Sequence, residues 1–564
     1  MSLHQHLRRI STSLPRSVLF YLGTTALLAL VLHQVAIVGD FRIDDAYISF
    51  SFSNNLAAGN GPVFSHGVRV EGYSNFLWVV LVALGSLVHS GTDPYPVARV
   101  LAFAFLLIGV VCTYRLARRH ASRWAAFFAL ALLLSSTDVV RATLSGLETV
   151  PYMAALVFGW YVYLREPAHA RRYSLLAFLP AALLRINGFI PMAVVIGFEA
   201  ASSVLERRLS VRVFLRWVAP AVLMYGLYFL WRYDYYGLLF PSTYYAKEFV
   251  ALNAPTRGFD QAYGFLRESA GLAVIPLMFL PLVLQPRREG WGLMAAVVVQ
   301  VAYSIYVGGD WMPFNRFFLP ILPLACVLAA WGAQIAMTSV RSAPWLARAG
   351  VGSLLAGVLG LVAVYGYSGT VETEEERRKL AEAQHVLRHT HENLLGVTDL
   401  VQHVIRQPGE KLVTDYAGVF GVFTDAKVID MWGLCTEEIA LRGGVEGINP
   451  IFGKECAECY VDIEPDYFHV VVPLARPRHA FRNVDQVIAQ MFQGRAIDRH
   501  LDLRRRYAVG RVVDVTAPDR AFWFLERRRP NMPLTPRNPT PGTCVDYPFE
   551  RRPSFAGARP DACG

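Results

Sequence analysis

Long apolar runs dominate the first two thirds of this chain. They recur at about the 20-residue length that spans a membrane, as far as about residue 368 of 564. Only 17% of the residues are charged, whereas soluble proteins average about 25%. Segment 369–564 differs, with the run EEERRK, many Pro and Arg, and strand-like runs such as HVVVPL. We therefore predict an all-α polytopic membrane domain over residues 1–368 and a soluble α/β or α+β domain over residues 369–564.

The net charge of +10 does not indicate a nucleic-acid partner. Arg residues gather in short loops between apolar runs, as the positive-inside rule predicts for a protein in a lipid bilayer. No RNA- or DNA-binding module is visible, so we expect no nucleic-acid binding. The apolar run 18–38, which follows Arg8, Arg9 and Arg16, is too long for a typical signal peptide. We interpret it as an uncleaved first span.

The basic loops also predict an orientation. With the N-terminus inside, every later basic loop falls inside if segment 76–89 does not cross, and this segment is short for a crossing at about 1.5 Å per residue. About eleven crossings then put the first loop (40–95) and the C-terminal domain outside. The expected spans are 17–39, 96–116, 122–138, 149–165, 173–186, 188–205, 213–232, 268–285, 290–307, 316–338 and 348–368.

In this topology the unusual polar and aromatic segments share the outer face. They are FRIDDAYISF in the first loop, DVVRATLSGLETVP, LLRING, WRYDYYGLLFPSTYYAKE and VGGDWMPFNR. A transporter would instead place its polar residues near the bilayer midplane on broken helices in repeated halves, and no internal repeat is visible. The one-sided pattern favours an enzyme at the outer membrane surface, with a flippase for lipid-linked sugars or an inactive binding protein as alternatives.

Each residue type on this face has a use if the substrate is a sugar joined to a lipid phosphate. A carboxylate can take the proton from an acceptor hydroxyl, cations can hold the phosphate, and aromatic rings can stack on sugars. Asp44 and Asp45 point about 100° apart on a helix. One is therefore expected to be the general base, and the other can cap the helix, whose N-terminus favours carboxylates. Both could also serve only as cap or interface residues.

The other charged residues have structural alternatives. Lys247 is a candidate phosphate ligand or an interfacial lysine beside two belt tyrosines. Arg316 could bind phosphate or pair with Asp310. Arg185 needs a partner at its span end, for which Glu148 is one possibility, and structural pairing is favoured for Arg141 and Glu148. A divalent cation is possible where carboxylates gather, but no His/Cys spacing in the membrane part supports zinc, and we assign no metal ligand.

Four motifs resemble a known architecture. DDAYISFSFSNNLAAGNGPVF with the following RVEGYSNFLW, SGLETVPY, YYGLLFPSTYYAK and GGDWMPFNRFFLPILP resemble polytopic glycosyltransferases of the GT-C architecture. They are most similar to the terminal β-(1→2)-arabinofuranosyltransferases of actinobacterial cell-wall synthesis and their bacterial relatives. The resemblance covers about residues 16–370, and the tail more loosely through VIDMWGL and YFHVVV.

This resemblance implies an inverting glycosyltransferase with a polyprenyl-phosphate sugar donor, a glycan or glycolipid acceptor, and a periplasmic active site on a bacterial inner membrane. It implies a carboxylate base in the first external loop, which is Asp44 or Asp45 here, and short helices lying along the membrane there. Relatives often have R-P-E-G where this chain has Arg185-Ile186-Asn187-Gly188, so a carboxylate is lost. The candidate donor-binding residues are Arg69, Glu71, Tyr73, Asn75, Arg141, Glu148, Arg185, Tyr244, Tyr245, Lys247, Asp310 and Arg316.

The seven cysteines divide between the two predicted domains. Cys112 and Cys326 lie in expected spans and are interpreted as core thiols. The outer domain holds an odd number, Cys435, Cys456, Cys459, Cys544 and Cys563, so at least one is unpaired or bonded to another molecule. Cys456 and Cys459 could form a redox pair, half of a metal site or a structural bridge, and structural bridges are expected. Strands are predicted near 412–414, 428–431, 468–473 and 511–515, a helix over 390–407, and a loosely ordered Pro/Arg-rich tail from about 528.

Overall fold

The structure is a computed structural model that describes most of the chain. It covers residues 16–340, except 90, 166–170, 208–209, 248–253, 269–270, 311 and 313–314. Between 341 and 400 it describes only residues 350, 353, 357 and 360. Beyond this it covers 401–528, except 402–403, 406, 444–455, 471–483, 491–493 and 515–520, and finally 543–546.

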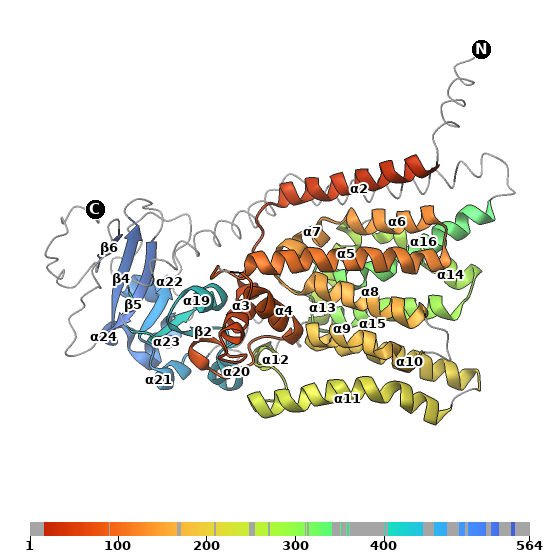
Figure 1. Cartoon of the computed structure of the whole chain (residues 1–564). Coiled ribbons are helices and arrows are strands. Elements are labelled where there is room, and N and C mark those ends of the chain that lie inside the picture. Colours follow the sequence, from red (N-terminus) through yellow and green to blue (C-terminus); the bar gives the residue numbers. More distant parts are fainter. Residues whose placement is uncertain are drawn as a thin grey trace, which may run out of the picture.

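A bundle of apolar helices makes up one end of the molecule (Figure 1). Five described helices are long and apolar enough to cross a membrane, and a sixth span results if α6 and α7, which meet at a 60° bend, are one. Each expected span up to residue 338 coincides with a helix or helix pair, and the expected span 348–368 lies largely outside the described residues. The elements are α2 (Arg16–Val38), α5 (Tyr95–His120), α6 (Arg123–Leu134), α7 (Thr137–Leu144), α8 (Thr149–Arg165), η2 (Arg171–Phe178), α9 (Leu179–Leu184), η3 (Ile186–Gly188), α10 (Phe189–Leu205), α11 (Val211–Tyr236), α14 (Gly271–Leu284), α15 (Arg288–Tyr306), η5 (Leu319–Ile321) and α16 (Leu322–Ser339).

Short helices lie between this bundle and the C-terminal sheet (Figure 1). They are α3 (Asp44–Ala57), η1 (Ser65–Gly67), α4 (Phe76–Ser86) and α12 (Ser242–Lys247), while α13 (Ala254–Glu268) packs on α15. Helix α4 has 11 residues and so extends only about 16 Å, about half the hydrocarbon thickness. This length agrees with the expectation that segment 76–89 does not cross.

The C-terminal region forms a six-stranded sheet with the order β2-β1-β3-β5-β4-β6. Strands β2, β1 and β3 are parallel, and the other neighbours pair antiparallel. The strands are β1 (Lys411–Thr414), β2 (Lys427–Asp430), β3 (Tyr467–Val470), β4 (Tyr507–Asp514), β5 (Ala521–Arg527) and β6 (Thr543–Asp546). The helices are α19 (Ala417–Phe423), α20 (Glu437–Arg442), α21 (Cys459–Ile463), α22 (Val484–Gln490), α23 (Gly494–Leu501) and α24 (Leu503–Arg506). The expected mixed fold and four of its strands are confirmed.

Two strands were not foreseen. Strand β5 pairs with both β3 and β4, and β6 pairs with β4. The latter lies inside the stretch expected to be a loosely ordered tail, so that prediction is wrong for residues 543–546; the rest of the tail beyond 528 lies outside the described residues. Most of the helix expected over 390–407 also lies outside them.

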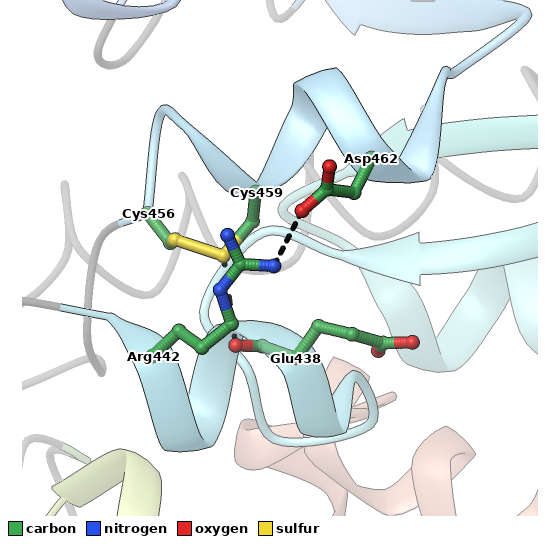
Figure 2. Close-up of a disulfide and its surroundings, with 5 residues drawn as sticks. All are labelled: Glu438, Arg442, Cys456, Cys459 and Asp462. Atoms are coloured by element: carbon green, nitrogen blue, oxygen red, sulfur yellow. Dashed lines mark hydrogen bonds and ion pairs between the residues drawn. A yellow bond between two sulfur atoms is a disulfide. The ribbon is translucent and has the colours of Figure 1, made fainter.

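The described cysteines agree with the prediction that they are core thiols or part of structural bridges. Cys456 and Cys459 form a disulfide beside the Arg442–Asp462 ion pair (Figure 2). Both half-cystines are buried, and Cys456–Cys459 joins the apolar core of the sheet region. Cys112, Cys326 and Cys435 are free and buried.

Candidate active site

A cavity of about 350 Å³ opens where the short helices meet the bundle. Its wall draws on α3, on the stretch before α4, and on the segments before α8, α10 and α16, together with α12 and α15. Nine of the predicted residues line it: Asp45, Tyr73, Asn75, Glu148, Arg185, Tyr244, Lys247, Asp310 and Arg316. These nine residues alone span 271 positions of the sequence, from Asp45 to Arg316, and thus bring distant segments together in one concave polar site.

The acidic pair divides between two tasks. Asp45 lines the cavity and Asp44 does not. The carboxylate of Asp44 instead accepts hydrogen bonds from the backbone N–H groups of Gly418 and Val419, at 3.2 and 2.8 Å. Its neighbour on α3 is therefore the carboxylate available to a bound ligand.

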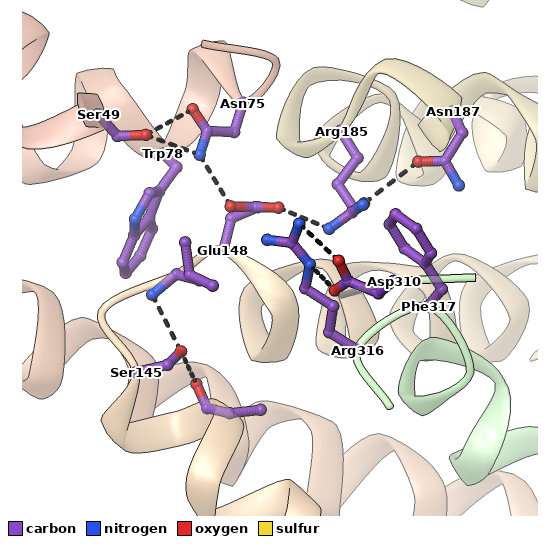
Figure 3. A network of polar contacts seen from close by, with 12 residues as sticks. Ser49, Asn75, Trp78, Ser145, Glu148, Arg185, Asn187, Asp310, Arg316 and Phe317 are labelled. Atoms are coloured by element: carbon purple, nitrogen blue, oxygen red, sulfur yellow. Dashed lines mark hydrogen bonds and ion pairs between the residues drawn. The ribbon is translucent and has the colours of Figure 1, made fainter. Parts of the chain in front are cut away.

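Glu148 lies at the centre of a buried polar network (Figure 3). Arg185 Nη1 donates to Glu148 Oε1 at 2.7 Å, and Asn75 Nδ2 donates to Glu148 Oε2 at 2.8 Å. Asn75 in turn exchanges hydrogen bonds with Ser49, and Arg185 Nε donates to Asn187 Oδ1 at 3.2 Å. The network joins α3, the start of α8 and the turn before α10, so it fixes three parts of the cavity wall relative to one another.

A left-handed glycine positions Glu148. Gly146 has φ 81°, a backbone region that side-chain-bearing residues rarely adopt. Its carbonyl accepts from Trp78 Nε1 at 3.0 Å, and an added Cβ would lie 3.1 Å from the Cβ of Ala46. The turn before α8 is therefore held against both α3 and α4.

Arg316 and Asp310 form an ion pair that the sequence had left open as one of two possibilities. Arg316 Nη2 donates to Asp310 Oδ1 at 3.2 Å, and both side chains are almost fully buried. Phe317 lies beside two guanidinium groups, 4.9 Å from that of Arg185 and 5.5 Å from that of Arg316. Stacking of this kind favours cations held out of water.

Glu71 supports the site from behind the wall. It pairs with Arg232, with Nη2 2.7 Å from Oε2, and both side chains are buried. The Glu71 carbonyl accepts from Ser242 N at 3.0 Å, and Arg232 Nη1 donates to the carbonyl of Leu239 at 2.7 Å. These bonds fasten the loop that leads into α12, which carries Tyr244 and Lys247.

The remaining predicted residues lie away from the cavity. Arg69 is exposed and stacks on Tyr235 at 5.0 Å, and Tyr245 packs edge-on against Tyr244. Arg141 pairs with Asp138 at 3.2 Å, where Asp138 also accepts from Asn315 at 2.9 Å.

Several cavity residues were not predicted from the sequence. Arg257, Tyr303, Tyr306 and Leu434 line the cavity but were not singled out. Arg257 lies on α13, which has apolar residues on one face and polar residues on the other. This amphipathic pattern over 254–268 could have revealed the helix. Leu434 comes from the C-terminal region, and nothing local in its sequence indicates a cavity.

The charges of the cavity act on one another. Burial raises the pKa of the Asp45 carboxyl above its ordinary value, and the positive charges of Lys247 and Arg316 oppose this rise. Burial lowers the pKa of the Lys247 ammonium, and the negative charge of Asp45 opposes that fall. A buried carboxylate with a raised pKa and facing cations are the features expected of an acid–base site.

A second cavity, of about 420 Å³, is lined mainly by apolar side chains of α13–α16. Ala262, Phe265 and Leu266 of α13 face it, whereas Arg257 of the same helix faces the polar cavity. Helix α15 likewise gives Tyr303 and Tyr306 to the polar cavity and Ala302 and Ile305 to the apolar one. The two helices thus lie between a charged and an apolar compartment.

No group of three or more His, Cys, Asp or Glu side chains is arranged to hold a metal ion among the described residues.

Comparison with known proteins identifies a curated relative. The chain is 30% identical over 331 residues to a terminal β-(1→2)-arabinofuranosyltransferase of Mycobacterium tuberculosis, a match that covers 51% of this chain and 52% of that protein. The chain therefore spans about half the length of the curated relative it matches. No family model matches the sequence.

Comparison with solved structures identifies the fold of the chain. ArnT from Cupriavidus metallidurans, bound to undecaprenyl phosphate, matches 91% of this chain and 98% of its own length with a TM-score of 0.54 at 13% identity. The chain has the ArnT fold. The oligosaccharyltransferase of Archaeoglobus fulgidus matches 92% of this chain and 76% of its own, with a TM-score of 0.51 at 10% identity. The ArnT fold and the curated relative confirm the resemblance to GT-C enzymes that the motifs indicated.

Proposed function

We propose that this protein is an inverting membrane glycosyltransferase that moves a sugar from a polyprenyl phosphate to a hydroxyl of a cell-envelope glycan or glycolipid. The observation that carries the proposal is the location of Asp45 in one cavity with Lys247 and Arg316. A base and two cations are the groups that such a transfer needs. The likeness to the arabinofuranosyltransferase of Mycobacterium tuberculosis supports arabinofuranose or another pentofuranose as the sugar.

The transfer is a single displacement at the anomeric carbon. The acceptor oxygen attacks that carbon while Asp45 takes the hydroxyl proton, and the bond from the anomeric carbon to the phosphate oxygen breaks. The electron pair leaves with the phosphate, whose added negative charge Lys247 and Arg316 stabilise. One displacement inverts the anomeric configuration.

The two cavities suit the two ends of the donor. The sugar phosphate lies in the polar cavity, and the apolar cavity across α13 and α15 takes part of the prenyl chain. ArnT, which shares the fold, was solved with undecaprenyl phosphate, and this supports a donor of the same chemistry. A flippase gains no such support, because the relatives identified by comparison are transferases.

The proposed site faces the periplasm from a bacterial inner membrane. The positive-inside rule supports this orientation, because the basic loops that include Arg118, Arg207 and Arg287 lie at ends of the helices away from the first loop in the expected topology. The C-terminal region, proposed as a soluble domain from residue 369, shares the periplasmic side.

The test is transfer by the purified full chain in lipid nanodiscs, with a polyprenyl-phosphate-linked arabinofuranose and a short arabinofuranoside acceptor. Asp45→Asn is expected to lower kcat by about 10²- to 10⁴-fold because it removes the base. Asp234→Asn makes the same chemical change at an exposed residue outside the cavity and should transfer normally. NMR of the product should show the inverted anomer. Full activity of Asp45→Asn would contradict the assignment of the base.

A further inference from the structure

The C-terminal region contacts Asp44 directly. Asp44, at the first turn of α3, accepts from Gly418 and Val419 at the first turn of α19. The first N–H groups of a helix have no partner within it, and here one carboxylate takes two of them. The bonds join residues 374 and 375 positions apart in sequence.

The two helices approach closely at this contact. A Cβ added to Gly418 would lie 2.1 Å from the Asp44 carbonyl oxygen and 2.8 Å from Ile48 N. Farther along, Ser51 Oγ donates to the Gly421 carbonyl at 3.1 Å. No side chain larger than hydrogen fits at position 418 without moving α3 and α19 apart.

A second contact from the same region reaches the cavity wall. The carboxylate of Asp430, at the end of β2, accepts from the backbone N–H groups of Trp432 and Cys435 at 3.0 and 2.9 Å. The loop so formed presents Leu434 to the cavity, and Cys435 packs on Gly72 with no room for a Cβ there. The C-terminal region therefore contacts both Asp44 and the stretch that precedes α4.

We propose that Asp44 is a positioning residue: it fastens α19 to the first turn of α3 and so holds Asp45 at its place in the cavity. This inference rests on the proposed function, in which Asp45 is the base. The two residues are adjacent on one helix, so a rotation of that first turn moves both. A misplacement of about 1 Å is enough to lower a rate about 100-fold.

Three variants test this role by kinetics. Asp44→Asn keeps one acceptor oxygen, which can still take the 2.8 Å bond from Val419 N, and loses the 3.2 Å bond from Gly418 N. We therefore expect transfer to fall only about fivefold, less than in Asp44→Ala, with an unchanged acidic limb of the pH–rate profile. Asp44→Ala loses the acceptor and should lower kcat about 50-fold, with KM for the donor within about threefold. If Asp44→Asn loses turnover as completely as Asp45→Asn and its acidic limb disappears, Asp44 is itself the base and the proposal is overturned.

Hydrogen exchange tests the contact without any substrate. Asp44→Ala should raise exchange in both α19 and residues 44–50, and Asp45→Asn should not raise it in α19. Gly418→Ala should reproduce the Asp44→Ala pattern, whereas Gly197→Ala, at a site where an added Cβ meets nothing within 4 Å, should leave it unchanged. Unchanged exchange in Asp44→Ala would overturn the proposal. Because this readout needs no donor, it separates failure of the positioning role from failure of the proposed transferase activity.

Discussion

Arg185 Nη1 lies 2.7 Å from Glu148 Oε1, and this pair is buried at the wall of the polar cavity. The exposed fractions of the two side chains are 10% and 5%. The pair thus joins two segments from different parts of the bundle. Glu148 also accepts a hydrogen bond from Asn75 Nδ2. This buried pair therefore helps to fix the shape of the cavity.

Removing the carboxylate of this pair should destabilise the protein strongly. Glu148→Gln leaves Arg185 buried and charged without its counterion, and we expect a loss of about 3–5 kcal/mol. Thermal unfolding in detergent measures it. Arg442→Ala breaks an exposed pair with Asp462 and serves as the control, with no measurable change expected. Equal unfolding temperatures for Glu148→Gln and wild type would argue against a structural role for the pair.

The pH–rate profile of transfer should be bell-shaped. Its two limbs should lie closer together than the ordinary pKa values of an aspartate and a lysine. Asp45 must be ionised to accept a proton, so activity rises with pH through its pKa, which burial raises above the ordinary 3.8. Lys247 must be protonated, so activity falls as pH passes its pKa, which burial lowers below 10.5. The variant Lys247→Arg stays charged at high pH and should lose the alkaline limb, as kcat measured from pH 4 to 10 will show. An alkaline limb that persists in this variant would assign that limb to another group.

Gly146→Ala should destabilise the turn before α8. An alanine must adopt φ near 81°, which costs about 1–2 kcal/mol, and its Cβ must fit 3.1–3.2 Å from Ala46 and Phe50. We expect a lower unfolding temperature together with reduced transfer. The matched change Gly226→Ala, in α11 where nothing lies within 4 Å of the new Cβ, should be neutral or stabilise by up to about 1 kcal/mol. Similar losses in both variants would contradict the special role of Gly146.

Loss of the Cys456–Cys459 bridge should have a modest effect. The bridge closes a loop with a sequence separation of three, so it restricts the unfolded chain little, by about 2 kcal/mol in the chain-entropy model. Neither cysteine lines the polar cavity. The double variant Cys456→Ser/Cys459→Ser should therefore fold, unfold at a slightly lower temperature and transfer sugar at the wild-type rate. A large loss of transfer with an unchanged fold would instead favour a redox role.

The helices of the bundle and most charged groups of the cavity could be predicted from the sequence for a common physical reason. Lys247 and Arg316 stand out because a polar residue at the end of an apolar run is rare and costly. Asp44 and Asp45 could not be told apart, because the difference between them depends on Gly418 and Val419, far along the chain. Local periodicity contains no information about such a contact.

The C-terminal sheet was predicted only in part. Strands β1 to β4 coincide with short β-branched or aromatic runs, whereas β5 directly precedes an Arg/Pro-rich stretch that masked it. Arg257 was missed because α13 has no long apolar run to mark it, and only its amphipathic spacing separates it from a loop.

The bond between Asp44 and the first turn of α19 also bears on biogenesis. The ribosome makes residue 44 early and residue 418 much later, with almost every helix of the bundle synthesised in between. A nascent chain halted after α16 would already contain the charged groups of the membrane part, yet Asp44 would still lack its partner. This contact therefore forms only after α19 has been synthesised and has folded back onto the first loop.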